Sequence, residues 1–256
     1  MMFAHGFGCD QNMWRFTAPL FEDRFKVVLF DHVGCGRSDI KAYQVERYRT
    51  LEGYARDIVE IAETYDLHDI IFVGHSVSAM MGILAAKMAP QRFSRLILIV
   101  PSACYIDAAP DYFGGFSRAD LEGLLDLMEK NFVGWASFLA PMVLKNDDQP
   151  DLQKELATSF CAADPSIARR FAAVTFLSDH RADLRDVAQP SLILQCSDDA
   201  IAPASAIEFV HQQLPASTLH LLKATGHCPH MTHPTETAAA INQYLEAQGL
   251  PLRRER

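Results

Sequence analysis

The stretch Ile70-Ile71-Phe72-Val73-Gly74-His75-Ser76-Val77-Ser78-Ala79-Met80 predicts a buried strand that turns sharply into a helix, with a serine at the turn. Such a turn holds the hydroxyl outside the sheet and at a helix N-terminus, where free backbone N–H groups favour developing negative charge. The usual pattern is G-x-S-x-G, and here another small residue, Ser78, occupies the last position. Ser76 is therefore the candidate nucleophile. These residues alone leave open a serine that only caps a helix.

The composition predicts one globular unit that does not bind nucleic acid or membranes. The chain has 256 residues, of which 49% are apolar and 21% charged, so we expect one domain, with room for an inserted subdomain. A formal charge of −9 argues against nucleic acid or anionic membrane as the main partner, because both bind clustered basic surfaces. The basic run Arg253-Arg254-Glu255-Arg256 is expected to be a frayed tail.

Cysteine usage and the absence of targeting signals favour a cytoplasmic protein. The six cysteines are spread along the chain without a C-x-x-C pair, which predicts reduced thiols. No apolar run reaches the roughly 20 residues of a membrane span, and the N-terminus has no signal-peptide pattern. We therefore expect cytoplasmic localisation.

Short apolar runs rich in β-branched residues alternate with helical patterns along most of the chain. The expected strands are 26–31, 69–74, 95–100, 191–196 and 218–222, and the expected helices are 50–66, 76–89, 203–214 and 234–247. Continuous apolar strands such as 96–100 are typical of a parallel sheet that is covered on both faces. The alternation predicts a doubly wound α/β fold with a mostly parallel sheet.

A helical insertion interrupts this alternation between residues 101 and 186. Its helices are expected at 121–132, 134–144, 152–161 and 167–177. We therefore assign residues 1–100 and 187–256 to the core and 101–186 to a helical cap. Most aromatic side chains of the cap must pack as core, but a minority facing Ser76 would suffice for an apolar pocket. The candidate substrate-binding residues are Phe116, Phe132, Trp135, Phe138 and Phe176.

A serine nucleophile needs a histidine base and an acid that orients it, in the chain order Ser, Asp, His. Asp198 and Asp199 follow the expected strand at 191–196, and His227 follows the strand that ends near residue 222. We favour Asp199 because it lies four residues before Pro203, where this turn usually presents its acid. Asp198 would then be a turn residue.

The hydrogen-bond donors that stabilise the oxyanion are expected to come from the backbone. The N–H groups of Phe7, in a glycine-bounded turn after a short strand, and of Val77, after the nucleophile, are candidates for an oxyanion hole. The alternative for the segment that contains Phe7 is a plain glycine turn.

The glycine-containing segment 31–38 lacks the third glycine of a nucleotide-binding loop, so we interpret it as a structural turn.

The spacing of His227, His230 and His233 superficially resembles a metal site. Pro229 and Pro234 would break any helix that aligned the three rings, and no cluster of carboxylates or thiolates completes a zinc pattern. We therefore expect neither a metal nor a cofactor.

With these residues in place, the chain resembles the α/β-hydrolases, and most closely the bacterial stress-response hydrolase RsbQ and the plant strigolactone and karrikin receptors. The segments that carry the resemblance are 6–11, 74–80, 111–116, 131–135, 160–161 with 164–165, 178–181 and 226–230. The resemblance implies a V-shaped four-helix cap over an apolar pocket, with Ser76, Asp199 and His227 at its floor. Members of this fold usually have two more antiparallel strands at the N-terminus, so those strands are expected to be missing here.

The leading hypothesis is a serine hydrolase of a small, largely apolar ester or lactone. The resemblance also implies a role in bacterial stress signalling, with a PAS-domain phosphatase or another signalling protein as partner. The alternative is a small-ligand signalling receptor that hydrolyses its ligand slowly or once. An inert structural protein is disfavoured, because all the catalytic elements are present.

Overall fold

The computed structural model describes residues 1–250, and the basic run at 253–256 lies outside these residues. Six strands form one sheet in the order β2-β1-β3-β4-β5-β6, with every neighbouring pair parallel. The strands are β1 (Met2–Ala4), β2 (Val28–Leu29), β3 (Ile70–His75), β4 (Phe93–Ile99), β5 (Ser191–Gln195) and β6 (Ser217–Leu221). This arrangement confirms the predicted α/β fold with a mostly parallel sheet.

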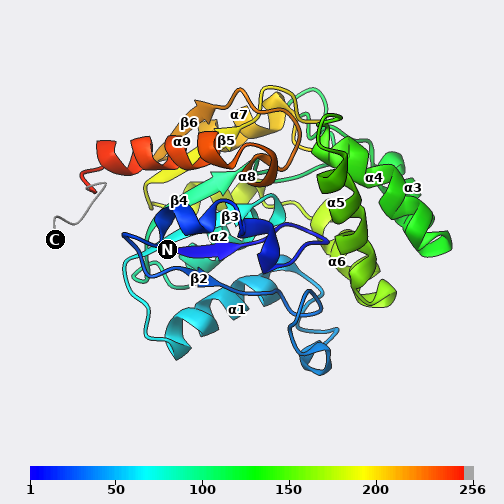
Figure 1. Cartoon of the computed structure of the whole chain (residues 1–256), viewed down its shortest axis with the longest axis horizontal. Coiled ribbons are helices and arrows are strands. Elements are labelled where there is room, and N and C mark those ends of the chain that lie inside the picture. Colours follow the sequence, from blue (N-terminus) through cyan, green and yellow to red (C-terminus); the bar gives the residue numbers. More distant parts are fainter. Residues whose placement is uncertain (251–256) are drawn as a thin grey trace.

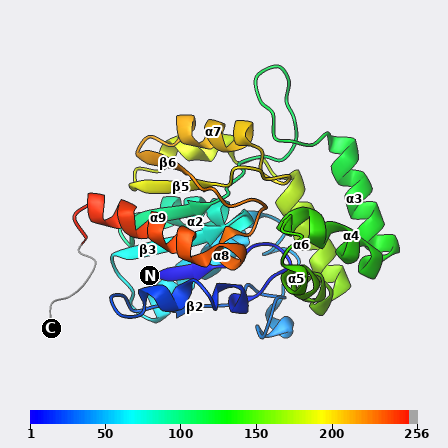
Figure 2. The same ribbon diagram turned by 45° about the horizontal axis from the view of Figure 1, so that its top comes forward.

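Helices cover both faces of the sheet (Figures 1 and 2). They are α1 (Leu51–Thr64), α2 (Val77–Met88), α7 (Ala204–Gln213), α8 (Pro229–Thr232) and α9 (Pro234–Ala247). Because both faces are covered, β3 is buried along its whole length, as a parallel strand in this position must be. Helix α2 is buried from Val77 to Ala86, which explains why its sequence is apolar all round rather than amphipathic. No helix of residues 1–250 has the length and apolar character needed to cross a bilayer.

Four consecutive helices between β4 and β5 lie together at one end of the sheet (Figure 1, green). They are α3 (Arg118–Lys130), α4 (Phe132–Leu144), α5 (Pro150–Ala162) and α6 (Pro165–Leu177). Their apolar side chains form a cluster separate from the main core, which Cys9 and Met13 of the N-terminal segment join. The N-terminal segment therefore packs against these helices.

The four helices begin two or three residues earlier than their apolar patterns predicted. Polar caps and prolines set the starts: Ser117 and Asp120 form a capping box before α3, and the Asp164 side chain accepts the amides of Ser166 and Ile167 before α6. A first helical turn made of such residues has no apolar periodicity. The expected starts at 121 and 167 were therefore late.

Short elements account for the other differences. β2 has two residues rather than the expected six, because only Val28 and Leu29 pair with the short strand β1. One-turn 3-10 helices at Gln11–Trp14, Ala18–Phe21 and Ile40–Ala42, and a longer one at Arg181–Asp186, were not expected. As predicted, no helix runs through His227, His230 and His233: Pro229 and Pro234 each begin a new helix, α8 and α9, a position where proline is tolerated.

Candidate active site

Ser76 lies at the turn between β3 and α2 with a φ of 55° and a ψ of −121°, a conformation that L residues rarely adopt. Gly74 makes this turn possible, because a Cβ at that position would lie 2.5 Å from the carbonyl oxygen of Ser78. Ser78, which replaces the usual glycine, is fully buried, and its hydroxyl donates to the carbonyl of His5. The departure from G-x-S-x-G therefore adds a hydrogen bond between α2 and the segment that follows β1.

Three side chains from distant parts of the chain form a continuous hydrogen-bonded line. Ser76 Oγ lies 2.7 Å from His227 Nε2, and His227 Nδ1 lies 2.7 Å from Asp199 Oδ2. With the ring proton on Nδ1, His227 donates to Asp199 and accepts from Ser76. The His227 and Asp199 side chains are only 5% and 2% exposed, so water competes little for these contacts.

The backbone holds Asp199 in its orientation toward His227. Its Oδ1 accepts the amides of Ile201 and Ala202, at 2.8 and 3.1 Å, which leaves Oδ2 for the histidine. Asp198 points elsewhere and forms an ion pair with Lys145 at the surface. The structure therefore places Asp199, and not Asp198, beside His227.

The loop that carries His227 is anchored to helix α4. The His227 amide donates to the Val143 carbonyl at 2.7 Å. Gly226 precedes it with a φ of 81°, and a Cβ there would lie 2.0 Å from the Leu144 carbonyl oxygen. Only glycine fits this contact. The C-terminal end of α4 thus helps to set the position of the imidazole.

His75 contacts three parts of the site at once. It directly precedes Ser76, and its Nε2 lies 2.7 Å from the His227 carbonyl oxygen, to which it donates. A Cβ on Gly6 would lie 2.4 Å from His75 Nδ1, so the ring also packs tightly against the turn before Phe7. The side chain is 2% exposed. One buried imidazole therefore joins the serine turn, the histidine loop and the N-terminal turn.

The two candidate oxyanion donors lie at the expected turns. Val77 is the first residue of α2, where a helix leaves its amide without an internal partner. Phe7 follows the packed Gly6, and its ring lines the same pocket as Ser76. Neither amide donates a hydrogen bond to another group within residues 1–250. Both N–H groups are therefore free to bind a ligand oxygen.

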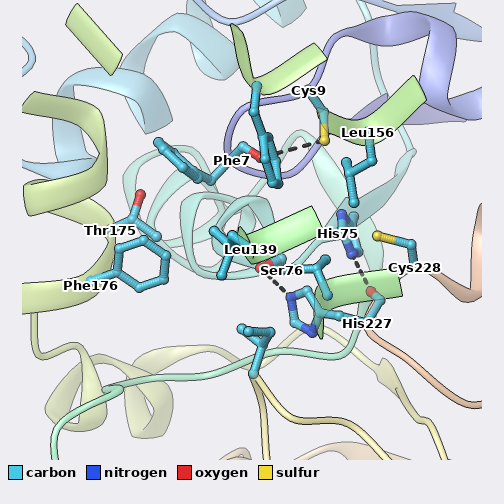
Figure 3. Close-up of a pocket in the computed structure, with 13 residues that line it drawn as sticks. Phe7, Cys9, His75, Ser76, Leu139, Leu156, Thr175, Phe176, His227 and Cys228 are labelled. Atoms are coloured by element: carbon cyan, nitrogen blue, oxygen red, sulfur yellow. Dashed lines mark hydrogen bonds between the residues drawn. The ribbon is translucent and has the colours of Figure 1, made fainter. Parts of the chain in front are cut away.

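Ser76 and His227 line a small, mostly apolar pocket between the sheet and helices α4–α6 (Figure 3). The other lining residues are Phe7, Cys9, His75, Leu139, Val143, Leu156, Phe160, Thr175, Phe176, Ile201 and Cys228. The cavity volume is about 30 Å³. By the same measure one water molecule needs roughly 10–15 Å³, so the pocket is narrow in this conformation.

Of the five aromatic side chains predicted to bind substrate, only Phe176 lines the pocket. Phe132 and Trp135 stack on each other with ring centroids 5.7 Å apart, and Trp135 packs behind the lining residue Phe160. Phe116 is half-buried among the apolar side chains of the four helices. None of these three side chains lines the pocket.

The prediction for Phe138 was wrong, because this side chain is 55% exposed on the outer side of α4. Leu139 and Val143, four residues apart on the same helix, line the pocket instead. Successive helical residues are rotated by about 100°, so a residue next to a lining position points away from the cavity. Aromatic character alone did not indicate which face of α4 points inward.

Several residues of the site were missed by the sequence reasoning. Cys228 could have been found from its position beside His227, whereas Thr175 and Ile201 carry no signal in the sequence. Tyr105 was not among the predicted site residues, but its hydroxyl lies 3.3 Å from Ser76 Oγ. Burial raises the pKa of Tyr105, so its hydroxyl stays protonated beside the serine.

The three closely spaced histidines do not converge. His230 packs its ring between Trp14 and His75, whereas His233 Nδ1 contacts the Thr232 hydroxyl. Across residues 1–250, no group of three or more His, Cys, Asp or Glu side chains has the arrangement of a metal site.

Comparisons with known proteins agree with this geometry. The family model described as "Alpha/beta hydrolase family" matches residues 1–240. The chain is 36% identical over 246 residues to the Karrikin insensitive 2 receptor CA of Petunia hybrida, a match that covers 96% of this chain and 91% of the relative. It is 33% identical to Strigolactone esterase D14 of Arabidopsis thaliana, with the same two coverages.

Solved structures give the same picture. A hydrolase from Oleispira antarctica superposes with a TM-score of 0.93 at 43% identity, covering 96% of this chain and 90% of that one. An esterase from Exiguobacterium antarcticum superposes with a TM-score of 0.87 at 18% identity, covering 96% of this chain and 91% of that one. At that identity the second match shows a shared fold and no more.

Proposed function

Because the chain belongs to the α/β-hydrolase family, we propose that it hydrolyses a small, largely apolar ester or lactone, with Ser76 as nucleophile. The observation that carries the proposal is the unbroken hydrogen-bonded line from Ser76 through His227 to Asp199, with both contacts at 2.7 Å. A serine that only caps a helix does not need a buried imidazole hydrogen-bonded to its hydroxyl. Two relatives have the word esterase in their names, which agrees with this chemistry.

Each residue has one role in the proposed reaction. Ser76 Oγ attacks the ester carbonyl carbon while His227 Nε2 takes the hydroxyl proton. Asp199 holds the Nδ1 proton and stabilises the imidazolium that forms. The amides of Phe7 and Val77 bind the oxyanion of the tetrahedral intermediate. When this intermediate collapses, His227 donates the proton to the leaving alcohol, and the acyl group stays on Ser76. Water, with His227 again as the base, then attacks the acyl group and releases the acid.

The pocket supports a small and largely apolar substrate. Its lining is dominated by aliphatic, aromatic and sulfur-containing side chains, which favour an uncharged ligand. Because the cavity is only about 30 Å³, a ligand larger than a few water molecules requires α4–α6 to shift. We propose that residues 101–186 act as a cap over a core formed by 1–100 and 187–256, and that this cap controls entry.

The test is the substitution Ser76→Ala, assayed with p-nitrophenyl acetate and butyrate. The account predicts that kcat falls by a factor on the order of 10⁴–10⁶, while the midpoint of thermal unfolding stays close to that of the parent. Ser205→Ala, at an exposed serine that does not line the pocket, is the matched control and should keep the parent rate. Equal rates in Ser76→Ala and the parent would remove Ser76 from the mechanism.

A signalling receptor that uses the same three residues is the second candidate. The narrow, covered pocket supports it, and several relatives are named as receptors. Such a protein would couple cap movement to a partner such as a PAS-domain phosphatase in stress signalling. Turnover of a few events per hour, together with a ligand-dependent rise in the thermal unfolding midpoint, would favour the receptor over the enzyme.

A further inference from the structure

Thr175 carries a buried hydroxyl in the pocket wall without a hydrogen-bond partner. The residue belongs to α6, is 2% exposed and lines the cavity next to Phe176. Within residues 1–250, its Oγ1 has no hydrogen-bond partner. In Figure 3, Thr175 and Phe176 occupy the side of the pocket opposite His75 and Cys228. The residue therefore lies across the cavity from the histidine side of the site.

Four other helical threonines of this protein satisfy their hydroxyls through the backbone. The Oγ1 atoms of Thr64, Thr158, Thr232 and Thr237 each donate to the carbonyl four residues earlier, at 2.7, 2.8, 3.2 and 3.0 Å. This contact is the usual solution for a threonine inside a helix. Thr175 does not make the equivalent contact with the carbonyl of Phe171. Its hydroxyl is thus available to a ligand.

A buried hydroxyl without a partner is unfavourable, because it has lost its hydrogen bonds to water. Valine has nearly the same shape and would fill this apolar wall without that cost. A ligand oxygen that reached Oγ1 would recover the lost hydrogen bond. An all-carbon ligand would leave the hydroxyl unpaired, so the pocket would discriminate between the two.

We propose that Thr175 Oγ1 donates a hydrogen bond to a second oxygen of the ligand. The substrate class is then an ester or lactone with a further ether, hydroxyl or carbonyl oxygen, separated from the carbonyl that Ser76 attacks. This assignment rests on the proposed function, because it concerns the ligand of the same pocket. It narrows that ligand from a simple apolar ester to one with a polar atom at its far end.

The experiment compares esters that differ only in one oxygen. p-Nitrophenyl hexanoate is paired with analogues in which one chain methylene at a time is replaced by an ether oxygen. For each pair, kcat/KM of the oxygen-containing ester is divided by that of the hexanoate, in the parent and in Thr175→Val. Differences in intrinsic ester reactivity are the same for both proteins, so they cancel when the two ratios are compared.

We expect the ratio to fall about 5-fold in Thr175→Val for at least one oxygen position, the effect of one neutral hydrogen bond. Thr175→Ser, which keeps a hydroxyl, should retain most of the parent ratio. Thr158→Val, at an exposed helical threonine, is the matched control and should leave it unchanged. An unchanged ratio at every oxygen position in Thr175→Val would overturn the assignment.

A binding measurement separates failure of this inference from failure of the proposed function. If the parent hydrolyses none of the esters, the proposed function fails, and the same esters serve as uncleaved ligands. Their dissociation constants are then measured by titration on Ser76→Ala with and without Thr175→Val. If an oxygen-containing ester binds more tightly than the hexanoate, and this difference is lost with Thr175→Val, the hydrogen bond from Thr175 is supported although hydrolysis is not. Equal affinities, or no binding by either variant, would overturn it.

Discussion

Ser76 is held in a backbone conformation that costs on the order of 1–3 kcal/mol, and such strain persists only where the surroundings impose it. The surroundings here are the buried strand β3, the missing side chain at Gly74 and the hydrogen bond from Ser78 to His5. The strain aims one hydroxyl at His227 Nε2. It therefore has a direct functional consequence in the proposed mechanism.

At the same scale, the two neighbouring aspartates should behave very differently. Asp199→Asn should lower kcat for ester hydrolysis by about 10⁴-fold, because an amide at this position favours the wrong tautomer of His227. Asp198→Asn is the matched control. It breaks only an exposed ion pair with Lys145, of a kind that contributes at most about 1 kcal/mol, so kcat should change little. Similar losses in both variants would show that Asp199 has no special role.

Among the elements, helix α8 is joined to the end of β3 and to the first 3-10 helix by buried aromatic rings. The His230 ring lies 4.5 Å from that of Trp14 and 4.3 Å from that of His75, measured between centroids. Both ring nitrogens of His230 are buried without a partner in the described chain. Burial, followed by the nearby His227, lowers the pKa of His230 to about 3. Burial likewise lowers the pKa of His75 well below its ordinary value.

These two histidines make the packing of α8 sensitive to acid. In the unfolded chain each binds a proton below about pH 6.5, whereas in the folded chain each stays neutral to a lower pH. The unfolded state therefore holds more protons as the pH falls, and each histidine lowers the free energy of unfolding by up to about 1.4 kcal/mol per pH unit below 6.5. We expect urea unfolding to show lower stability at pH 5.5 than at pH 7.5.

The substitution His230→Phe tests this account, because it removes one of the buried titrating groups and keeps an aromatic ring. The loss of stability between pH 7.5 and 5.5 should be smaller in His230→Phe than in the parent. His68→Phe changes an exposed histidine and should leave the pH dependence as in the parent. The same pH dependence in His230→Phe and the parent would exclude His230 as a source of the acid sensitivity.

For the whole molecule, the parallel sheet explains how residues far apart in the sequence meet. β1, β3, β5 and β6 all end on the same side, so the segments that follow them carry Phe7, Ser76, Asp199 and His227 to one edge. The helices inserted after β4 then cover this edge, and the end of α4 binds the His227 loop. The same helices that enclose the pocket thus help to position the base.

The sequence predicted this framework because strands, turns and the order of Ser, Asp and His leave local patterns. It could not show which faces of α4 and α6 point inward, since Phe138 and Leu139 are both apolar neighbours and only packing distinguishes them. Nor could it show the unpartnered hydroxyl of Thr175 or the position of Tyr105, which depend on side-chain contacts between distant segments. Helix starts were misplaced where polar caps precede the apolar pattern.

The most direct test of the central claim is labelling of the intact protein with a serine-directed fluorophosphonate, followed by mass mapping of the modified peptide. The account predicts one adduct, on Ser76, formed rapidly in the parent and much more slowly in His227→Ala, because the imidazole activates the hydroxyl. An adduct on another serine, or labelling of Ser76 at the same rate without His227, would contradict it.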